Sequence, residues 1–62
     1  MALLSERQQR IVSLLASSAG PLTGSELAQE LGVSVRTVQA EVARINGGGA
    51  LIESSNRGYR LR

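Results

Sequence analysis

The sequence predicts a small α+β fold, mainly helical, in which three helices precede a C-terminal β-hairpin. Three observations support this prediction. Apolar residues recur at helical spacing in three stretches, glycine or proline punctuates the chain after each stretch, and two strand-like runs near the C-terminus flank a polar segment. A chain of 62 residues has room for one domain with a small core. We therefore expect residues 1–62 to form a single domain.

The first helix is expected over about residues 5–18. Ser5 and Gln8 have the spacing of a capping box, in which each side chain bonds to the other residue's backbone N–H. A buried stripe follows at Ile11, Leu14 and Leu15. The segment around Pro21 then has to be extended, and it can add one edge strand to a sheet.

Two more helices are expected over about residues 24–31 and 35–46, with a single tight turn between them. Thr23 and Glu26 form a second capping box, Gly32 supplies the left-handed residue that ends the first of these helices, and Ser34 caps the next. The buried stripe of the later helix comprises Val35, Val38, Val42 and Ile45. This arrangement is a helix-turn-helix, a unit that places its second helix in a DNA major groove. A structural or protein-binding αα-hairpin shows the same caps and stripes and stays an alternative.

Residues 50–62 are expected to form the β-hairpin. The runs 50–53 and 59–62 are strand-like, and residues 54–58 form a polar tip between them. Side chains alternate between the two faces of a strand, so Ile52, Tyr59 and Leu61 should pack on the helices. Arg60 and Arg62 should then point outward. A hairpin that follows a helix-turn-helix in this way is a wing.

Positive charge is concentrated in the second half of the chain. Residues 33–62 contain five arginines and two glutamates, whereas residues 1–32 contain two arginines and three glutamates. All basic residues are arginine, whose forked guanidinium suits phosphate and guanine, although a GC-rich genome explains the same usage equally well. For Arg7 and Arg10 of the first helix, a solvated face is expected rather than a phosphate contact.

Composition excludes several functional classes. The chain has no Cys and no His, and its five acidic residues are all Glu, so the usual catalytic triads and His- or Cys-based metal sites cannot form. We expect no enzyme activity and no cofactor. Because no apolar run is long enough to span a bilayer and the N-terminus lacks the apolar region of a signal peptide, we expect no membrane association and a cytoplasmic location.

Three segments of the sequence are similar to a known family: RQQRIVSLL from Arg7, LAQELGVSVRTVQAEV from Leu27, and RGYRL from Arg57. They resemble the winged helix-turn-helix at the N-terminus of bacterial transcription regulators, which include biotin-repressor, DeoR-like and sugar-system regulators. The resemblance implies double-stranded DNA as the partner, with the recognition helix in the major groove and the wing on the flanking backbone or minor groove. The residues that match the DNA-binding surface of the family are Ser34, Arg36, Thr37, Gln39, Arg44, Asn56 and Arg57. Many members have an Arg-Asp pair in mid-helix, where this chain has Ala40-Glu41 and so keeps only the acid.

Helical geometry assigns roles to some of these residues. Turning the valine stripe inward at about 100° per residue places Arg36 on the opposite face, with Thr37 and Gln39 on the shoulders. Arg36 can fork onto a guanine, Gln39 can pair with an adenine, and the Thr37 methyl group can contact a thymine methyl group. Ser34 and the helix start can hold a phosphate, in addition to the role of Ser34 as a cap.

The function predicted from the sequence is sequence-specific DNA binding as the N-terminal domain of a bacterial transcriptional regulator. The alternative is a winged-helix module that binds other proteins without binding DNA. Because the sequence ends on the last wing strand, we expect an effector domain C-terminal to it and a homodimer of the full-length protein.

Overall fold

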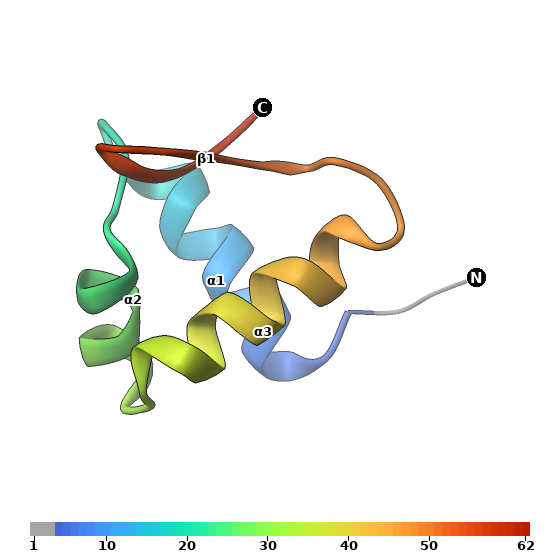
Figure 1. Ribbon diagram of the computed structural model, residues 1–62, viewed down its shortest axis with the longest axis horizontal. Helices are drawn as coiled ribbons and strands as arrows, with labels where there is room; N and C mark the ends of the chain where they lie inside the picture. Colours follow the sequence, from blue (N-terminus) through green and yellow to red (C-terminus); the bar gives the residue numbers. More distant parts are fainter. Residues whose placement is uncertain (1–3) are drawn as a thin grey trace.

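The computed structural model describes residues 4–62, which form three helices and a two-stranded antiparallel hairpin. Their bounds are α1 (Glu6–Ser17), α2 (Gly24–Leu31), α3 (Val35–Asn46), β1 (Ile52–Ser55) and β2 (Gly58–Leu61). Figure 1 shows the three helices packed across one another, with the hairpin running along one side of them and its tip near the chain that leads into α2. The predicted fold class is confirmed.

The predicted helix signals fix the observed helix ends. In the first capping box Ser5 Oγ accepts from Gln8 N at 3.2 Å, and Gln8 Oε1 accepts from Ser5 N at 3.0 Å. Thr23 and Glu26 repeat this pattern at 3.1 and 2.8 Å. Gly32 ends α2 with a φ of 70°, a conformation that glycine adopts without steric cost. Among residues 4–62, no helix has both the length and the apolar character needed to cross a membrane.

The core lies where the three helices meet. Each helix contributes one fully buried side chain: Ile11 from α1, Leu27 from α2 and Val38 from α3. The rest of the core consists of Leu15, Ala28, Val42, Ile45 and Ile52.

One predicted core position is wrong. Val35, expected in the buried stripe, is 38% exposed. It is the first residue of α3, and it lies beside Gly24 at the start of α2, outside the core cluster. The buried stripe of α3 therefore begins at Val38.

The wing pairs closer to its tip than the sequence suggested. The strands pair Ile52 with Leu61 and Ser55 with Gly58, so only Asn56 and Arg57 remain in the turn. The first strand therefore begins and ends two residues later than predicted, and the second begins and ends one residue earlier. The predicted five-residue loop 54–58 contracts to a two-residue turn, because the polar residues on both sides of the turn join the ladder. The predicted alternation is confirmed: Ile52 is buried, Tyr59 and Leu61 are half-buried, and Arg60 and Arg62 are exposed.

Backbone contacts fix the wing to the entrance of α2. Leu22 N donates to Tyr59 O at 2.9 Å, and Tyr59 N donates to Leu22 O at 2.7 Å. The extended residues at Pro21 thus add a one-residue strand to the hairpin, as expected. Gly58 makes this approach possible: a Cβ at position 58 would lie 2.5 Å from the Leu22 carbonyl oxygen, and the φ of Gly58 is 127°.

Candidate nucleic-acid interface

The start of α3 presents most of the predicted DNA-binding residues. Ser34 caps the helix, since its Oγ accepts from Thr37 N at 3.1 Å, and it also lies 3.0 Å from Thr37 Oγ1. Arg36 and Gln39 are exposed, whereas Thr37 is half-buried. Within residues 4–62, Arg36 makes no ion pair, so its guanidinium is available to a ligand.

The wing tip lies on one flank of α3. A groove of about 270 Å³ separates the tip from α2 and α3, and its lining includes Thr23, Val35, Gln39, Asn56 and Tyr59. The structure therefore brings Gln39 and Asn56 to one groove, although they lie far apart in the sequence. Arg57 is exposed at the tip, and its guanidinium makes no ion pair in the part of the chain that the structure describes.

The other wing arginines are bound within the hairpin. Arg60 Nε and Nη2 both donate to Glu53 Oε1 at 3.1 Å, and Arg62 Nε donates to Glu53 Oε2 at 3.4 Å. The hydrogen bond and the positive charge of Arg60, followed by those of Arg62, hold the pKa of the Glu53 carboxyl below its ordinary value of 4.5. Much of the positive charge of the second half of the chain is thus neutralised locally, and Arg36 and Arg57 are its two arginines without an acidic partner among residues 4–62.

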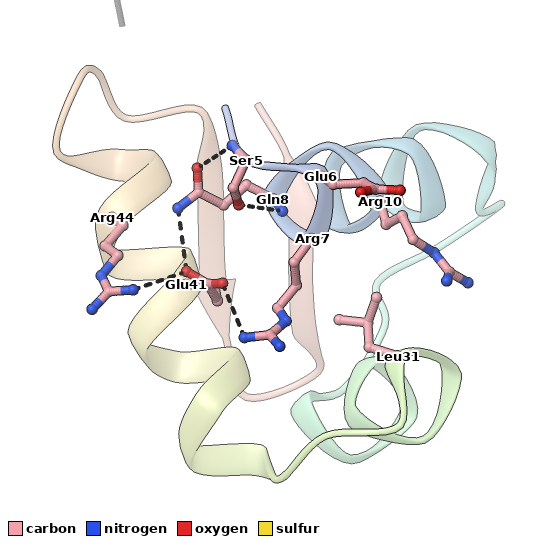
Figure 2. A pocket seen from close by; sticks show the side chains of 8 residues that line it. All are labelled: Ser5, Glu6, Arg7, Gln8, Arg10, Leu31, Glu41 and Arg44. Atoms are coloured by element: carbon pink, nitrogen blue, oxygen red, sulfur yellow. Dashed lines mark hydrogen bonds and ion pairs between the residues drawn. The ribbon is translucent and has the colours of Figure 1, made fainter. Parts of the chain in front are cut away.

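Glu41 is a buried acid whose role the sequence prediction missed. Its side chain is 6% exposed, and it receives hydrogen bonds from three side chains of α1 and α3 (Figure 2). Arg7 Nη1 donates to Oε2 at 3.5 Å, and Gln8 Nε2 and Arg44 Nη1 donate to Oε1 at 3.2 and 3.4 Å. Arg7 is exposed, as expected of a solvated face, but its ion pair with Glu41 was not predicted. The sequence did contain a signal, because Glu41 is three residues after Val38 and four before Ile45, a spacing that places it at the edge of the buried stripe.

Asn46 is the second residue that the sequence prediction passed over. It is expected only at the end of the helix predicted over residues 35–46, but its side chain is half-buried and binds the backbone of β1. Asn46 Oδ1 accepts from Ile52 N at 3.0 Å, and Asn46 Nδ2 donates to Ile52 O at 3.0 Å. The Asn46 amide therefore satisfies both backbone groups of Ile52, as a neighbouring strand would. These two hydrogen bonds fix the wing to the end of α3.

Comparison with known proteins agrees with this geometry. The sequence model of a family described as "HTH domain" matches residues 7–60. A protein of Escherichia coli (strain K12) that carries the name of an frv operon regulatory protein is 40% identical over 63 residues, which cover 95% of this chain and 10% of that protein. A protein of Thermotoga maritima that carries the name of a transcription repressor, NiaR, is 38% identical over 56 residues, which cover 90% of this chain and 32% of that protein.

This chain thus spans about a tenth and about a third of the length of these two relatives. The family match extends from α1 to the last strand of the wing. Together with three helices and a hairpin in the expected order, it confirms the resemblance read from the sequence. The chain belongs to the helix-turn-helix domain family, as a winged member of the DNA-binding kind found in bacterial transcription regulators.

Proposed function

We propose that this domain binds double-stranded DNA sequence-specifically, with α3 in the major groove and the wing on the flanking backbone or minor groove. The observation that supports this most directly is the distribution of unpaired charge. Arg36 at the exposed start of α3 and Arg57 at the wing tip have no acidic partner among residues 4–62, whereas the other arginines of the second half each have one. Residues near the start of a recognition helix are those that reach base edges.

Seven residues form the proposed DNA contact. Their roles divide between base contacts near the start of α3 and backbone contacts at its ends and on the wing. They are Ser34, Arg36, Thr37, Gln39 and Arg44 of the recognition helix and its cap, with Asn56 and Arg57 of the wing tip.

The proposal extends to the whole protein. The two relatives are much longer than the matched region, which supports a further domain in the whole protein. The proposal is that an effector domain lies beyond the wing and that the full-length protein is a homodimer that binds two half-sites. The proposal includes a cytoplasmic location, because that is where a bacterial regulator meets DNA. No enzymatic role is proposed for the domain, because its sequence lacks the side chains of the usual catalytic triads and of His- or Cys-based metal sites.

Weak, strongly salt-dependent DNA binding is the first expected result. A single winged helix makes few phosphate contacts, so the isolated domain should bind non-specific duplex DNA with a Kd of roughly 10⁻⁴ to 10⁻⁶ M at physiological salt, and more tightly at low salt. Fluorescence titration of a labelled duplex at several salt concentrations measures this. A salt-independent Kd would contradict DNA binding and favour a protein partner docked through an apolar face.

Arg36 and Arg57 should differ in what they contribute. Arg36→Ala should cost about 1–3 kcal/mol on the specific site and relax the preference at one base pair, because it removes a forked contact to a guanine. Arg57→Ala should weaken binding to all sequences about equally and lower the salt slope by about one unit, because it removes a backbone contact. The measurement is a binding series on a selected operator and its single-base variants.

If the full-length protein dimerises, this series is measured on the intact dimer, because specific binding then requires two half-sites about 34 Å apart. Arg62→Ala serves as the matched control, since it removes the same charge from a side chain already bound to Glu53. If Arg57→Ala changed the base preference and Arg36→Ala lowered affinity uniformly, the roles given to helix and wing would be reversed.

A further inference from the structure

Glu41 joins two arginines that come from different helices. Arg7 extends from the first turns of α1 and Arg44 from the last turn of α3, and both direct Nη1 at the Glu41 carboxylate (Figure 2). Gln8 donates to the same carboxylate and also closes the capping box at Ser5. The beginning of α1 is thereby held against the flank of the recognition helix.

Each of the two guanidinium groups binds Glu41 on one side and is exposed to solvent on the other. The Glu41 side chain is 6% exposed, whereas those of Arg7 and Arg44 are 49% and 73% exposed. Each arginine uses Nη1 for the carboxylate, and its Nε and Nη2 make no further hydrogen bond among residues 4–62. A guanidinium has five N–H donors in a rigid fork, so the remaining donors of each arginine can bind an anion from the solvent side.

These donors surround an open hollow beside α3. It has a volume of about 550 Å³ and lies between the start of α1, the end of α2 and α3, with Arg7, Arg10, Leu31, Glu41 and Arg44 in its lining. The groove under the wing lies on another side of α3, where Gln39 lines it. Gln39 and Arg44 are five residues apart, which places them roughly 140° apart around a helix. The hollow and the wing therefore flank α3 on different sides.

A helix in the major groove has a sugar-phosphate backbone on each flank. We propose that Arg7 and Arg44 bind the DNA backbone on the flank of α3 away from the wing, and that Glu41 is the positioning residue that aligns both guanidinium groups for it. The inference rests on the proposed DNA binding. It extends the interface to α1, which the sequence left outside it, and it gives the acid at position 41 a role without direct contact to DNA.

The first test compares two arginines of α1. Arg7→Ala should weaken binding to every sequence about equally and reduce the slope of log K against log salt concentration by about 0.9, the value for one lost phosphate contact. Arg10→Ala removes the same charge from the same helix. Arg10 also lines the hollow, but it makes no ion pair with Glu41 and points away from it in Figure 2, so Glu41 does not align its guanidinium. Arg10→Ala should therefore change the slope less. Arg7→Lys keeps the charge and loses the fork, so its binding should lie between that of the wild type and that of Arg7→Ala.

The second test asks whether Glu41→Gln weakens or tightens DNA binding. Removing a negative charge near DNA should tighten binding if only net charge matters. If Glu41 positions the arginines, Glu41→Gln should instead weaken binding to all sequences. In an Arg7→Ala, Arg44→Ala background the same substitution should no longer weaken binding, because nothing remains to be aligned. Thermal melts of each variant fix a temperature at which all are folded, and if Glu41→Gln does not fold, the comparison of Arg7 with Arg10 decides.

The outcomes separate this inference from the function on which it rests. No salt-dependent binding by the wild-type domain would overturn the proposed function itself. If the wild type binds DNA but Arg7→Ala and Arg10→Ala change the salt slope equally, the proposed function stands. The inferred contact of the Glu41-aligned arginines with the DNA backbone would then be overturned. Tighter binding by folded Glu41→Gln would likewise overturn the positioning role.

Discussion

Gly58→Ala should destabilise the domain more than a glycine-to-alanine substitution at any other glycine. The new Cβ would lie 2.5 Å from the Leu22 carbonyl oxygen and 2.9 Å from Thr23 N, and position 58 has a φ of 127°. A side chain in such a backbone conformation costs about 1–3 kcal/mol, and separating the wing from Leu22 adds the loss of two hydrogen bonds. A domain of this size has a total stability of roughly 3–9 kcal/mol, so much of it should be lost. Thermal or urea unfolding measures the change.

Gly48→Ala is the matched control. A Cβ at position 48 meets no atom within 4 Å, and Gly48 is not among the glycines with positive φ. The same methyl group should therefore leave the unfolding midpoint unchanged or raise it slightly, through the lower entropy of the unfolded chain. Equal midpoints for Gly58→Ala and Gly48→Ala would mean that β2 does not lie against the chain at Leu22.

Val38→Ala should have the next largest effect. The Val38 side chain is fully buried where α3 meets the other two helices. Truncating it leaves a cavity and should cost about 1–3 kcal/mol, which is a large part of the stability of so small a domain. Chemical denaturation gives the free energy of unfolding directly, provided that the slope with denaturant is unchanged.

The same truncation one turn earlier tests where the buried face begins. Val35 is 38% exposed, so Val35→Ala should change the free energy of unfolding by no more than about 0.5 kcal/mol. If Val35→Ala lowered the free energy of unfolding as much as Val38→Ala, Val35 would belong to the buried face, as the apolar spacing predicted. The pair therefore distinguishes the sequence pattern from the observed packing.

The helices could be predicted closely because their signals are local. Caps at Ser5, Thr23 and Ser34 act over three residues, and Gly32 ends α2 through its own backbone conformation. The ends of the wing strands differ from the predicted ones by two residues in β1 and by one in β2, because strand pairing depends on contacts across the turn that no single segment determines.

The predictable part of the candidate interface is the exposed face of α3. Helical spacing alone places Arg36 opposite the buried stripe, and the structure shows it exposed. The ion pairs of Arg44 with Glu41 and of Arg60 with Glu53 could not be predicted in the same way, because helical and strand spacing do not determine which exposed arginine meets an acid. These ion pairs decide which arginines remain without an acidic partner. The link from Arg7 to Glu41 joins residues 34 positions apart and required the folded chain.

The side-chain amide of Asn46 has a consequence for how the domain tolerates change in length. By binding both backbone groups of Ile52, it closes the segment 47–51 into a loop whose two ends are already joined at the base. Lengthening a loop that is closed at its base costs little, because the closure entropy rises only with the logarithm of its length. Insertions between α3 and the wing can therefore accumulate in this loop while the wing keeps its distance from the recognition helix, so this junction is where related domains can vary in sequence length without altering the surface that they present.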